Sequence, residues 1–196
     1  MINETEIKLD LNSIDKDTFI SMCLEKYPEL EKRESYQRDE YYDTTDMQLQ
    51  SNDFVVRVRK KDNVTMVALK SPRVYLSEYI QKRIELEFEV NNILPFEQIE
   101  SQGLIVIATI EKRRIILKGD DFVIEIDELP YIGLFAEIEA SNVEIINEVC
   151  LTLSLESFPK IRKNYGELLD DKLSKLGLPL RPNLTATFAK EQELFI

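Results

Sequence analysis

Charged side chains occupy every second position in several segments of the chain. In the opening segment ETEIKLDL, Glu4, Glu6 and Lys8 alternate with largely apolar residues. Because successive side chains of a strand point to opposite faces, this period of two predicts β-strands with one charged face. The further segments that we expect to form strands are residues 38–43, 53–61, 64–70, 80–90, 104–118, 121–128 and 133–140.

Other segments carry apolar residues at helical spacing. Ser13 or Asp15 can cap a helix whose apolar side runs from Phe19 to Leu30. The other predicted helices are residues 95–102, 142–158 and 165–176. The predicted fold class is therefore α+β, dominated by antiparallel strands in numbers that could close into a barrel with helices packed outside.

The charges of the predicted strands are segregated by sign. Acidic residues are concentrated in the first, fifth and last of these segments, and basic residues in the segments between them. An ordinary half-buried sheet would send such charges to bulk water. A closed barrel can instead point its charged face inward, and the lumen would then hold carboxylates for a metal beside cations for a polyanion.

Two acidic pairs are candidate metal ligands. Glu4 and Glu6 share one strand face, and Glu137 and Glu139 share another, with Asp127 one hairpin earlier. Such carboxylates suit Mg²⁺ or Mn²⁺, which are hard ions that prefer oxygen ligands. An exposed strand would explain either pair alone. Brought together on neighbouring strands, the pairs would repel one another unless a cation lay among them.

The basic residues supply the complement for an anion. Arginine binds phosphate oxygens bidentately and lysine adds a point charge. For any single residue, a solvated face with weak cross-strand salt bridges is the alternative. The candidate phosphate-binding residues are Arg57, Arg59, Lys70, Arg83, Lys112 and Arg114.

The composition limits the chemistry. The 196 residues fit one domain, and the net charge of −12 argues against nucleic acid as a partner. The absence of histidine excludes Ser-His and Cys-His nucleophiles and the commonest zinc ligand. Cys23 and Cys150 have neither CxxC spacing nor a secretory context, so we interpret them as buried thiols.

The chain shows no signal peptide after Met1 and no apolar run near the ~20 residues of a membrane span. We therefore expect a soluble, cytoplasmic protein with no membrane partner, either a monomer or a homodimer.

Eight motifs occur in the order seen in one protein family: ETEIK at 4–8, DEYYDTTD at 39–46, RVR at 57–59, ALKSP at 68–72, RIELE at 83–87, EKRR at 111–114, IDELPYIGLFAEIE at 126–139 and NYGELL at 164–169. The chain resembles the CYTH superfamily, the triphosphate tunnel metalloenzymes. This superfamily includes class IV adenylyl cyclases, thiamine triphosphatases and inorganic triphosphatases. Departures include Thr45, where many members have proline, and Asn164, where serine is usual.

The resemblance implies a tunnel of eight antiparallel strands that binds a triphosphate with a divalent metal, Mg²⁺ or Mn²⁺. It implies a tunnel domain at residues 1–170 and a C-terminal extension at 171–196, which would be a helix over one tunnel mouth or a tail. Glu4 and Glu6 match the ExExK signature, with Glu137 and Glu139 as the facing metal ligands. Arg57, Arg59, Lys70, Lys112 and Arg114 match phosphate-contacting positions, and Arg83, Glu85 and Glu87 match a further charged tunnel strand.

The resemblance also suggests catalytic residues. Tyr41 and Lys70 resemble the pair that thiamine triphosphatases place beside the scissile phosphate, and Lys8 completes the ExExK signature. A second metal, or a Lys or Tyr whose pKa is lowered by neighbouring cations, would activate water. Asp127 is predicted as an additional metal ligand.

Hydrolysis of inorganic triphosphate or of an organic triphosphate such as thiamine triphosphate is the function we expect first. A phosphatase needs only triphosphate recognition and water, whereas a cyclase must also grip adenine, and no purine-reading feature is visible. The alternatives are a class IV adenylyl cyclase, which converts ATP to cyclic AMP and pyrophosphate, and a non-catalytic module that binds a triphosphate or nucleotide.

Overall fold

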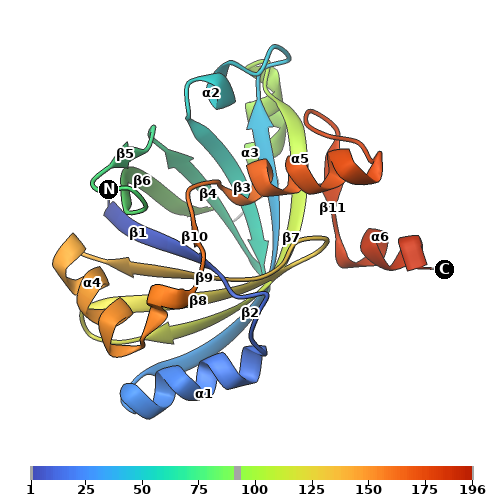
Figure 1. Cartoon of the computed structure of the whole chain (residues 1–196). Coiled ribbons are helices and arrows are strands. Elements are labelled where there is room, and N and C mark those ends of the chain that lie inside the picture. Colours follow the sequence, from blue (N-terminus) through green and yellow to red (C-terminus); the bar gives the residue numbers. More distant parts are fainter. Residues whose placement is uncertain (1, 91–93, 196) are drawn as a thin grey trace.

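The computed structural model describes residues 2–90 and 94–195. Eight antiparallel strands follow one another in the order β1-β9-β8-β7-β2-β3-β4-β6, and β6 pairs with β1 to close the barrel (Figure 1). These strands are β1 (Ile2–Asp10), β2 (Glu31–Asp43), β3 (Val55–Lys61), β4 (Val64–Lys70), β6 (Gln81–Val90), β7 (Ile105–Lys118), β8 (Phe122–Leu129) and β9 (Gly133–Ala140). The predicted α+β fold with an eight-stranded antiparallel barrel is confirmed.

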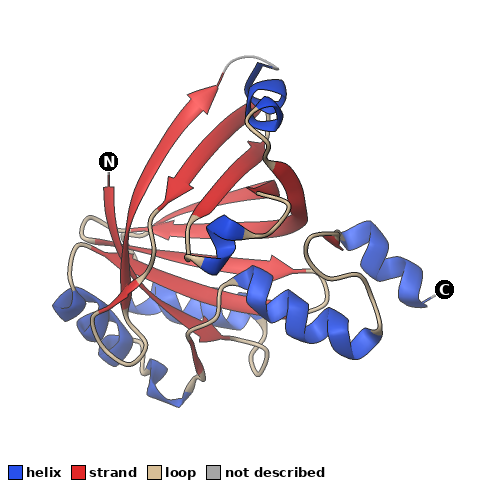
Figure 2. Ribbon diagram, turned by 90° about the horizontal axis from the view of Figure 1, so that it is seen from above, coloured by secondary structure: helices blue, strands red, loops and turns tan. Residues whose placement is uncertain are grey.

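Short strands and helices surround the barrel (Figure 2). β5 pairs with β6, β10 with β1, and β11 runs parallel to β7. The bounds are β5 (Val74–Tyr75), β10 (Lys160–Ile161), β11 (Leu184–Ala186), α1 (Lys16–Lys26), α2 (Gln48–Ser51), α3 (Leu94–Ser101), α4 (Val143–Thr152), α5 (Tyr165–Leu176), α6 (Phe188–Gln192), and the 3₁₀ helices η1 (Leu155–Ser157) and η2 (Glu193–Phe195). No helix among the described residues is long and apolar enough to cross a membrane.

Two predicted elements differ from the structure. β2 begins at Glu31, although the alternation predicted a strand from residue 38, because its first residues are polar on both faces and are held by the ladder to β7. The predicted helix at 142–158 ends at Thr152. Ser154 adopts a left-handed backbone with φ 54°, which interrupts the helix before η1.

The apolar faces of most strands point outward, under the helices. Outward residues of β1, β7, β8 and β9 pack against Phe19, Ile20 and Cys23 of α1 and against Ile146 and Val149 of α4. A smaller cluster joins outward residues of β2, β3 and β4 to α3. This burial on the outside leaves the opposite, charged faces of the strands pointing inward.

One end of the lumen is apolar and is covered by α5. Tyr165, Leu169 and Leu173 of this helix pack on Ala108 and Ile110 of β7 and on β11. Residues 171–196 therefore contain the end of α5, the added strand β11 and the helices α6 and η2.

The hairpin between β8 and β9 depends on one glycine. Gly133 has φ +87°, and a Cβ there would lie 2.0 Å from Oδ1 of Asn12. That oxygen accepts a hydrogen bond from the backbone N–H of Leu134. The close approach fixes the start of β9, two residues before its inward face begins.

Candidate functional site

The inward face of the barrel encloses a cavity of about 640 Å³. Its wall includes all the predicted tunnel residues except Asp127: Glu4, Glu6, Lys8, Tyr41, Arg57, Arg59, Lys70, Arg83, Glu85, Glu87, Lys112, Arg114, Glu137 and Glu139. Strand register explains this convergence, because Glu4 lies opposite Arg83 and Glu6 lies opposite Glu139 on the neighbouring strands. The predicted common face is thus a single cavity wall.

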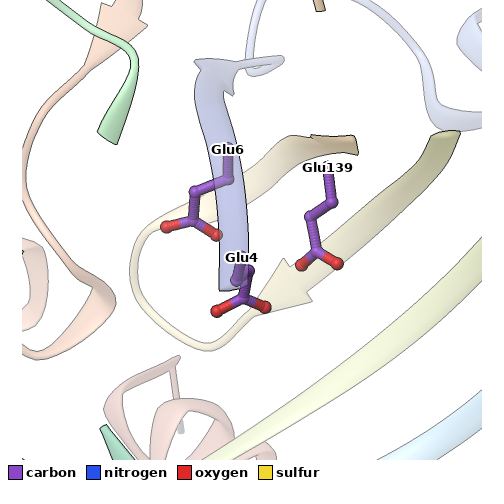
Figure 3. Close-up of side chains that lie close together, drawn as sticks. All are labelled: Glu4, Glu6 and Glu139. Carbon is purple, nitrogen blue, oxygen red and sulfur yellow. The ribbon is translucent and has the colours of Figure 1, made fainter. Parts of the chain in front are cut away.

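Glu4, Glu6 and Glu139 form an acidic cluster on β1 and β9 (Figure 3). One carboxylate oxygen from each lies within 4.8 Å of the others. Burial, and then Glu4 and Glu6, raise the pKa of Glu139 well above its usual range. Burial also raises the pKa of Glu4, despite the opposing charge of Lys70. Hard oxygen ligands whose ionisation is opposed by one another fit a divalent cation such as Mg²⁺ or Mn²⁺.

Glu137 has a different environment from Glu139, although both belong to β9. Its carboxylate lies 3.1 Å from Nζ of Lys8 and 3.0 Å from a guanidinium nitrogen of Arg114. Burial alone would raise the pKa of Glu137, but these two cations lower it to about 2. Glu125, Glu137 and Glu139 form a second acidic cluster that shares Glu139 with the first.

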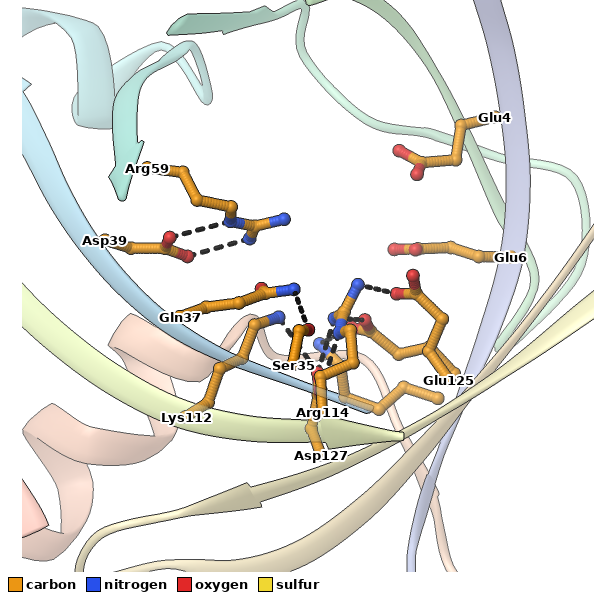
Figure 4. A network of polar contacts seen from close by, with 12 residues as sticks. Glu4, Glu6, Ser35, Gln37, Asp39, Arg59, Lys112, Arg114, Glu125 and Asp127 are labelled. Atoms are coloured by element: carbon orange, nitrogen blue, oxygen red, sulfur yellow. Dashed lines mark hydrogen bonds and ion pairs between the residues drawn. The ribbon is translucent and has the colours of Figure 1, made fainter. Parts of the chain in front are cut away.

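Two buried aspartates hold three cations of the cavity wall. Asp39 accepts two hydrogen bonds from Arg59, at 2.7 and 2.8 Å. Asp127 accepts from Nε of Arg114 at 2.6 Å and from Nζ of Lys112 at 3.0 Å. Figure 4 shows Arg59 with Asp39 across the lumen from Glu4 and Glu6.

The expected role of Asp127 as a metal ligand does not match its position. Its side chain is 0% exposed and lies behind Arg114 and Lys112, outside the cavity wall. Burial would raise the pKa of Asp127, but these two cations lower it below its usual range. The inward parity was predicted correctly, yet Asp127 lies level with Phe135, near the covered end of the lumen.

The third group of cations lies between β3, β4 and β6. Lys70 is 2.7 Å from Glu85 and 3.2 Å from Glu4, and Arg57 is 3.1 Å from Glu87. Arg83 instead donates to the backbone carbonyls of Ser71 and Asp53. These contacts place Lys70 and Arg57 between the acidic cluster and the arginine wall.

The predicted catalytic residues were Lys8, Tyr41 and Lys70, and Lys112 is a further lysine of the wall whose pKa is shifted. Burial and Asp39 raise the pKa of Tyr41, which contradicts the expected lowering and leaves the phenol a neutral hydrogen-bond donor. The pKa of Lys70 is also raised: burial and Arg57 oppose its charge, but Glu4, Glu85 and Glu6 outweigh them. Burial and Arg114 lower the pKa of Lys112 to about 7. Lys112 is thus the lysine of this wall that titrates near neutral pH.

Lys8 lies at the covered end of the lumen. Its Nζ lies 4.2 Å from the ring centroid of Tyr165 and donates to the carbonyl of Lys163 at 3.2 Å. The cation is therefore held between α5, the loop before it and Glu137.

Sequence reasoning missed several residues of the site. Asp39 follows the inward parity of Tyr41, so alternation alone could have found it. Glu125 shares the parity of Asp127, which the alternation does show, but it was not assigned a role. Gln81 donates to Glu6 and is signalled by parity with Arg83. Tyr165 carried no such signal, because its place under Lys8 depends on how α5 packs.

Comparison with known proteins adds a family and relatives. Residues 3–167 match the family model of the CYTH domain. A Methanocaldococcus jannaschii protein named "Putative adenylate cyclase" is 27% identical over 175 residues, which cover 84% of this chain and 97% of that protein.

Two solved archaeal structures resemble this one. The PH1012 protein of Pyrococcus horikoshii OT3 is 27% identical, with a TM-score of 0.68 and coverage of 84% of this chain and 98% of that chain. A conserved hypothetical protein of Pyrococcus furiosus is 25% identical, also with a TM-score of 0.68. The match covers 84% of this chain and 99% of that chain.

Proposed function

The chain belongs to the CYTH domain family, and we propose that it is a divalent-metal-dependent triphosphatase whose substrate lies inside the barrel. One observation carries this proposal: a carboxylate cluster on β1 and β9 faces cations of β3 and β7 across a cavity of about 640 Å³. A metal–triphosphate complex needs these two surfaces at once, because its cation seeks oxygen ligands and its phosphates seek cations.

The cations of the wall are suited to a fixed anion. Arg59 and Arg114 are each held by a buried aspartate, so their guanidinium groups are oriented before substrate enters. Charge that develops on the transferred phosphoryl group would then be stabilised without reorganisation of the protein. Lys70 and Arg57 would bind the remaining phosphate oxygens and Tyr41 would donate a hydrogen bond.

Glu4, Glu6 and Glu139 would hold the metal. When bound, an ion such as Mg²⁺ or Mn²⁺ polarises phosphoryl oxygens and lowers the repulsion between phosphates. The cations of the wall do not fully offset the negative charge of this cluster, since the pKa of Glu139 is raised and that of Glu4 is raised despite Lys70. Glu137, which pairs with Lys8 and Arg114, would orient these cations toward the phosphates.

We propose hydrolysis rather than cyclisation because the charged groups of the wall are suited to bind phosphates and a metal. The alternative, an adenylyl cyclase, is favoured by the name of the M. jannaschii relative. In that reaction the 3′ hydroxyl of ATP would attack the α-phosphorus and expel pyrophosphate.

A substrate panel tests the proposal. Inorganic triphosphate, thiamine triphosphate and ATP are incubated with Mg²⁺ or Mn²⁺, and orthophosphate, pyrophosphate and cyclic AMP are measured separately. We expect orthophosphate from inorganic or thiamine triphosphate at least as fast as from ATP, and ADP as the product of ATP. Cyclic AMP as the main product would replace the hydrolase by the cyclase. Tight binding with no product from any substrate would leave only a binding module.

A further inference from the structure

The outer face of β4 and β6 is apolar and exposed. Leu69 lies directly opposite Leu86, and Ile84 and Phe88 flank Leu86 along β6. These four side chains are between 41% and 45% exposed. Val74 and Leu76, 60% and 46% exposed, extend the same surface past the end of β4. We call these six residues the β4–β6 patch.

The patch exists because β6 places its charged side chains inward and its apolar side chains outward. Its glutamates, Glu85, Glu87 and Glu89, alternate onto the inward side, so the outward positions carry Ile84, Leu86 and Phe88. Outward apolar residues of β1, β8 and β9, by contrast, pack under α1 and α4. α3 covers Val67 and Val90 at one end of this face, and in the described part of the chain no other helix belongs to that cluster.

The size of the patch fits a protein interface. Its six side chains together expose roughly 500 Å², near the upper end of the largest apolar patches on monomeric proteins. A standard interface buries about 800 Å² per partner, and homodimer interfaces are about 65% apolar. An interface of that size and composition needs about as much apolar surface per partner as the patch exposes, with a polar rim around it.

The charge of the face favours a second copy of the chain. The molecule has a net charge of −12, so two copies repel each other over most of their surfaces. Within residues 64–70 and 81–90, however, the outward positions hold no carboxylate, and Lys82 is the charged one. A two-fold axis sets this face against the same face of the second copy, apolar against apolar, without apposing carboxylates at its centre.

We propose that the β4–β6 patch is the contact of a two-fold symmetric homodimer. The two barrels would pack with the outer faces of their sheets together, as sheets do in sandwiches, about 10 Å apart. The cavity is lined by the opposite, inward side of these strands, so the dimer leaves the proposed active site of each copy intact.

Sedimentation equilibrium on the purified full chain tests the proposal, at about 0.15 M salt and from about 1 to 200 μM. We expect a mass that rises from 22.9 kDa toward twice that value. Leu86→Glu places a carboxylate at the centre of each contact and should raise the dissociation constant at least 100-fold. Leu151→Glu is the matched control, because Leu151 is 71% exposed on α4 and lies outside the patch. It should dimerise as the wild type does.

A second variant guards against misfolding. Ile84→Thr keeps a β-branched residue on an exposed strand and should weaken the dimer about 10-fold while the circular dichroism spectrum stays unchanged. A wild type that remains at 22.9 kDa throughout the range overturns the proposal. A dimer that persists when both Leu86→Glu and Ile84→Thr are folded also overturns it. So does a monomer that binds phosphatidylcholine vesicles through the same residues in a flotation assay.

Discussion

Identical residue types are set to opposite ionisation behaviour along one strand of this barrel. Glu137 lies beside Lys8 and Arg114, which lower its pKa to about 2 against the effect of burial. Glu139, two residues later, is buried beside Glu4 and Glu6, and its pKa is raised. The wall therefore holds carboxylates that the protein's own cations keep ionised, such as Glu137, and carboxylates whose ionisation their neighbours oppose, such as Glu139.

Glu139→Gln tests that division. The change keeps shape and removes charge, so we expect turnover with Mg²⁺ or Mn²⁺ to fall about 10²–10³-fold. A carboxyl group with a raised folded pKa costs stability as pH rises through that pKa. The metal-free variant should therefore unfold at a higher temperature than the wild type at neutral pH, by about 2–4 °C per kcal/mol of repulsion relieved.

The control for Glu139→Gln is Glu144→Gln on α4, whose side chain is exposed. It should change neither turnover nor the unfolding temperature. Adding Mn²⁺ should stabilise the wild type and the control but not Glu139→Gln. Full turnover of Glu139→Gln, or of the wild type in EDTA, would contradict the proposed metal site.

Asp39→Asn tests the buried ion pair with Arg59. Removing one partner leaves the other charge buried without compensation, so we expect a loss of about 3–5 kcal/mol in the free energy of unfolding, measured in urea. Glu31→Gln, in the exposed pair with Arg33 on the same strand, should cost less than about 1 kcal/mol.

The pH dependence of Asp39→Asn follows from the pKa of Asp39. Burial would raise it, but Arg59 lowers it below its usual range. The pair therefore contributes stability above the unfolded pKa of about 3.9, and this contribution is lost as pH falls through the lower folded value. The difference between wild type and variant should shrink below about pH 4. A constant difference down to pH 2 would argue that the loss is not electrostatic.

At the residue scale, sequence alternation predicted which side chains face inward but not how deep each lies. Glu4, Arg57 and Arg114 line the cavity as expected. Asp127 has the same parity, yet it is covered by Arg114 and Lys112 near the apolar end of the lumen. Depth depends on strand tilt and on the position of α5, and neither is encoded in a local pattern.

Among the elements, α5 has the most direct connection to the site. Its capping box joins Asn164 and Glu167, and Glu167 also binds Arg73 from the loop after β4. Arg73 in turn binds Asp53 before β3. The first turn of α5 is thereby tied to two loops at the cavity wall, with Tyr165 under Lys8.

Asn164→Ala tests the role of that helix start. Loss of an N-cap side chain costs about 0.5–2 kcal/mol of stability. We expect this loss in urea unfolding, together with a several-fold fall in turnover, because Lys8 rests on the first turn of α5. Asn142→Ala, at the N-cap of α4 outside the barrel, is the matched control and should lose comparable stability with unchanged turnover. Equal turnover in the two variants would show that the start of α5 does not influence the site.

The strands were predictable wherever charged and apolar residues alternated. The first half of β2 was missed, since EKRESYQ lacks an apolar face and its pairing is decided by β7. β11 was also missed, because three residues carry no usable period and their parallel pairing with β7 is a tertiary contact.

For the whole molecule, the sheet separates an apolar exterior under helices from a charged interior. A ligand that contacts both acidic and basic walls should stabilise the barrel more than either half of it does. We expect imidotriphosphate, which resists hydrolysis, and Mn²⁺ together to raise the free energy of unfolding by about 2.7 kcal/mol at 100 times the dissociation constant. Either ligand alone, at the same concentration, should raise the free energy of unfolding by less. Thermal unfolding measures these differences.

Sodium sulfate at matched ionic strength is the control for this experiment and should give little stabilisation. The Glu139→Gln variant should lose the gain that Mn²⁺ adds to imidotriphosphate. The same shift with imidotriphosphate alone as with both ligands would contradict the joint binding of metal and phosphates.

β1 closes the barrel from the first residues of the chain. Its residues 5–10 pair with 135–140 of β9, and residues 2–6 pair with 81–85 of β6. During synthesis, β1 must therefore wait for β9, the last barrel strand in chain order, before both its edges are paired, and unpaired edges recruit other chains. The carboxylates of Glu4, Glu6 and Glu139 meet only across this seam. A divalent ion bound by these three carboxylates would link β1 to β9 and so stabilise the closed form of the barrel.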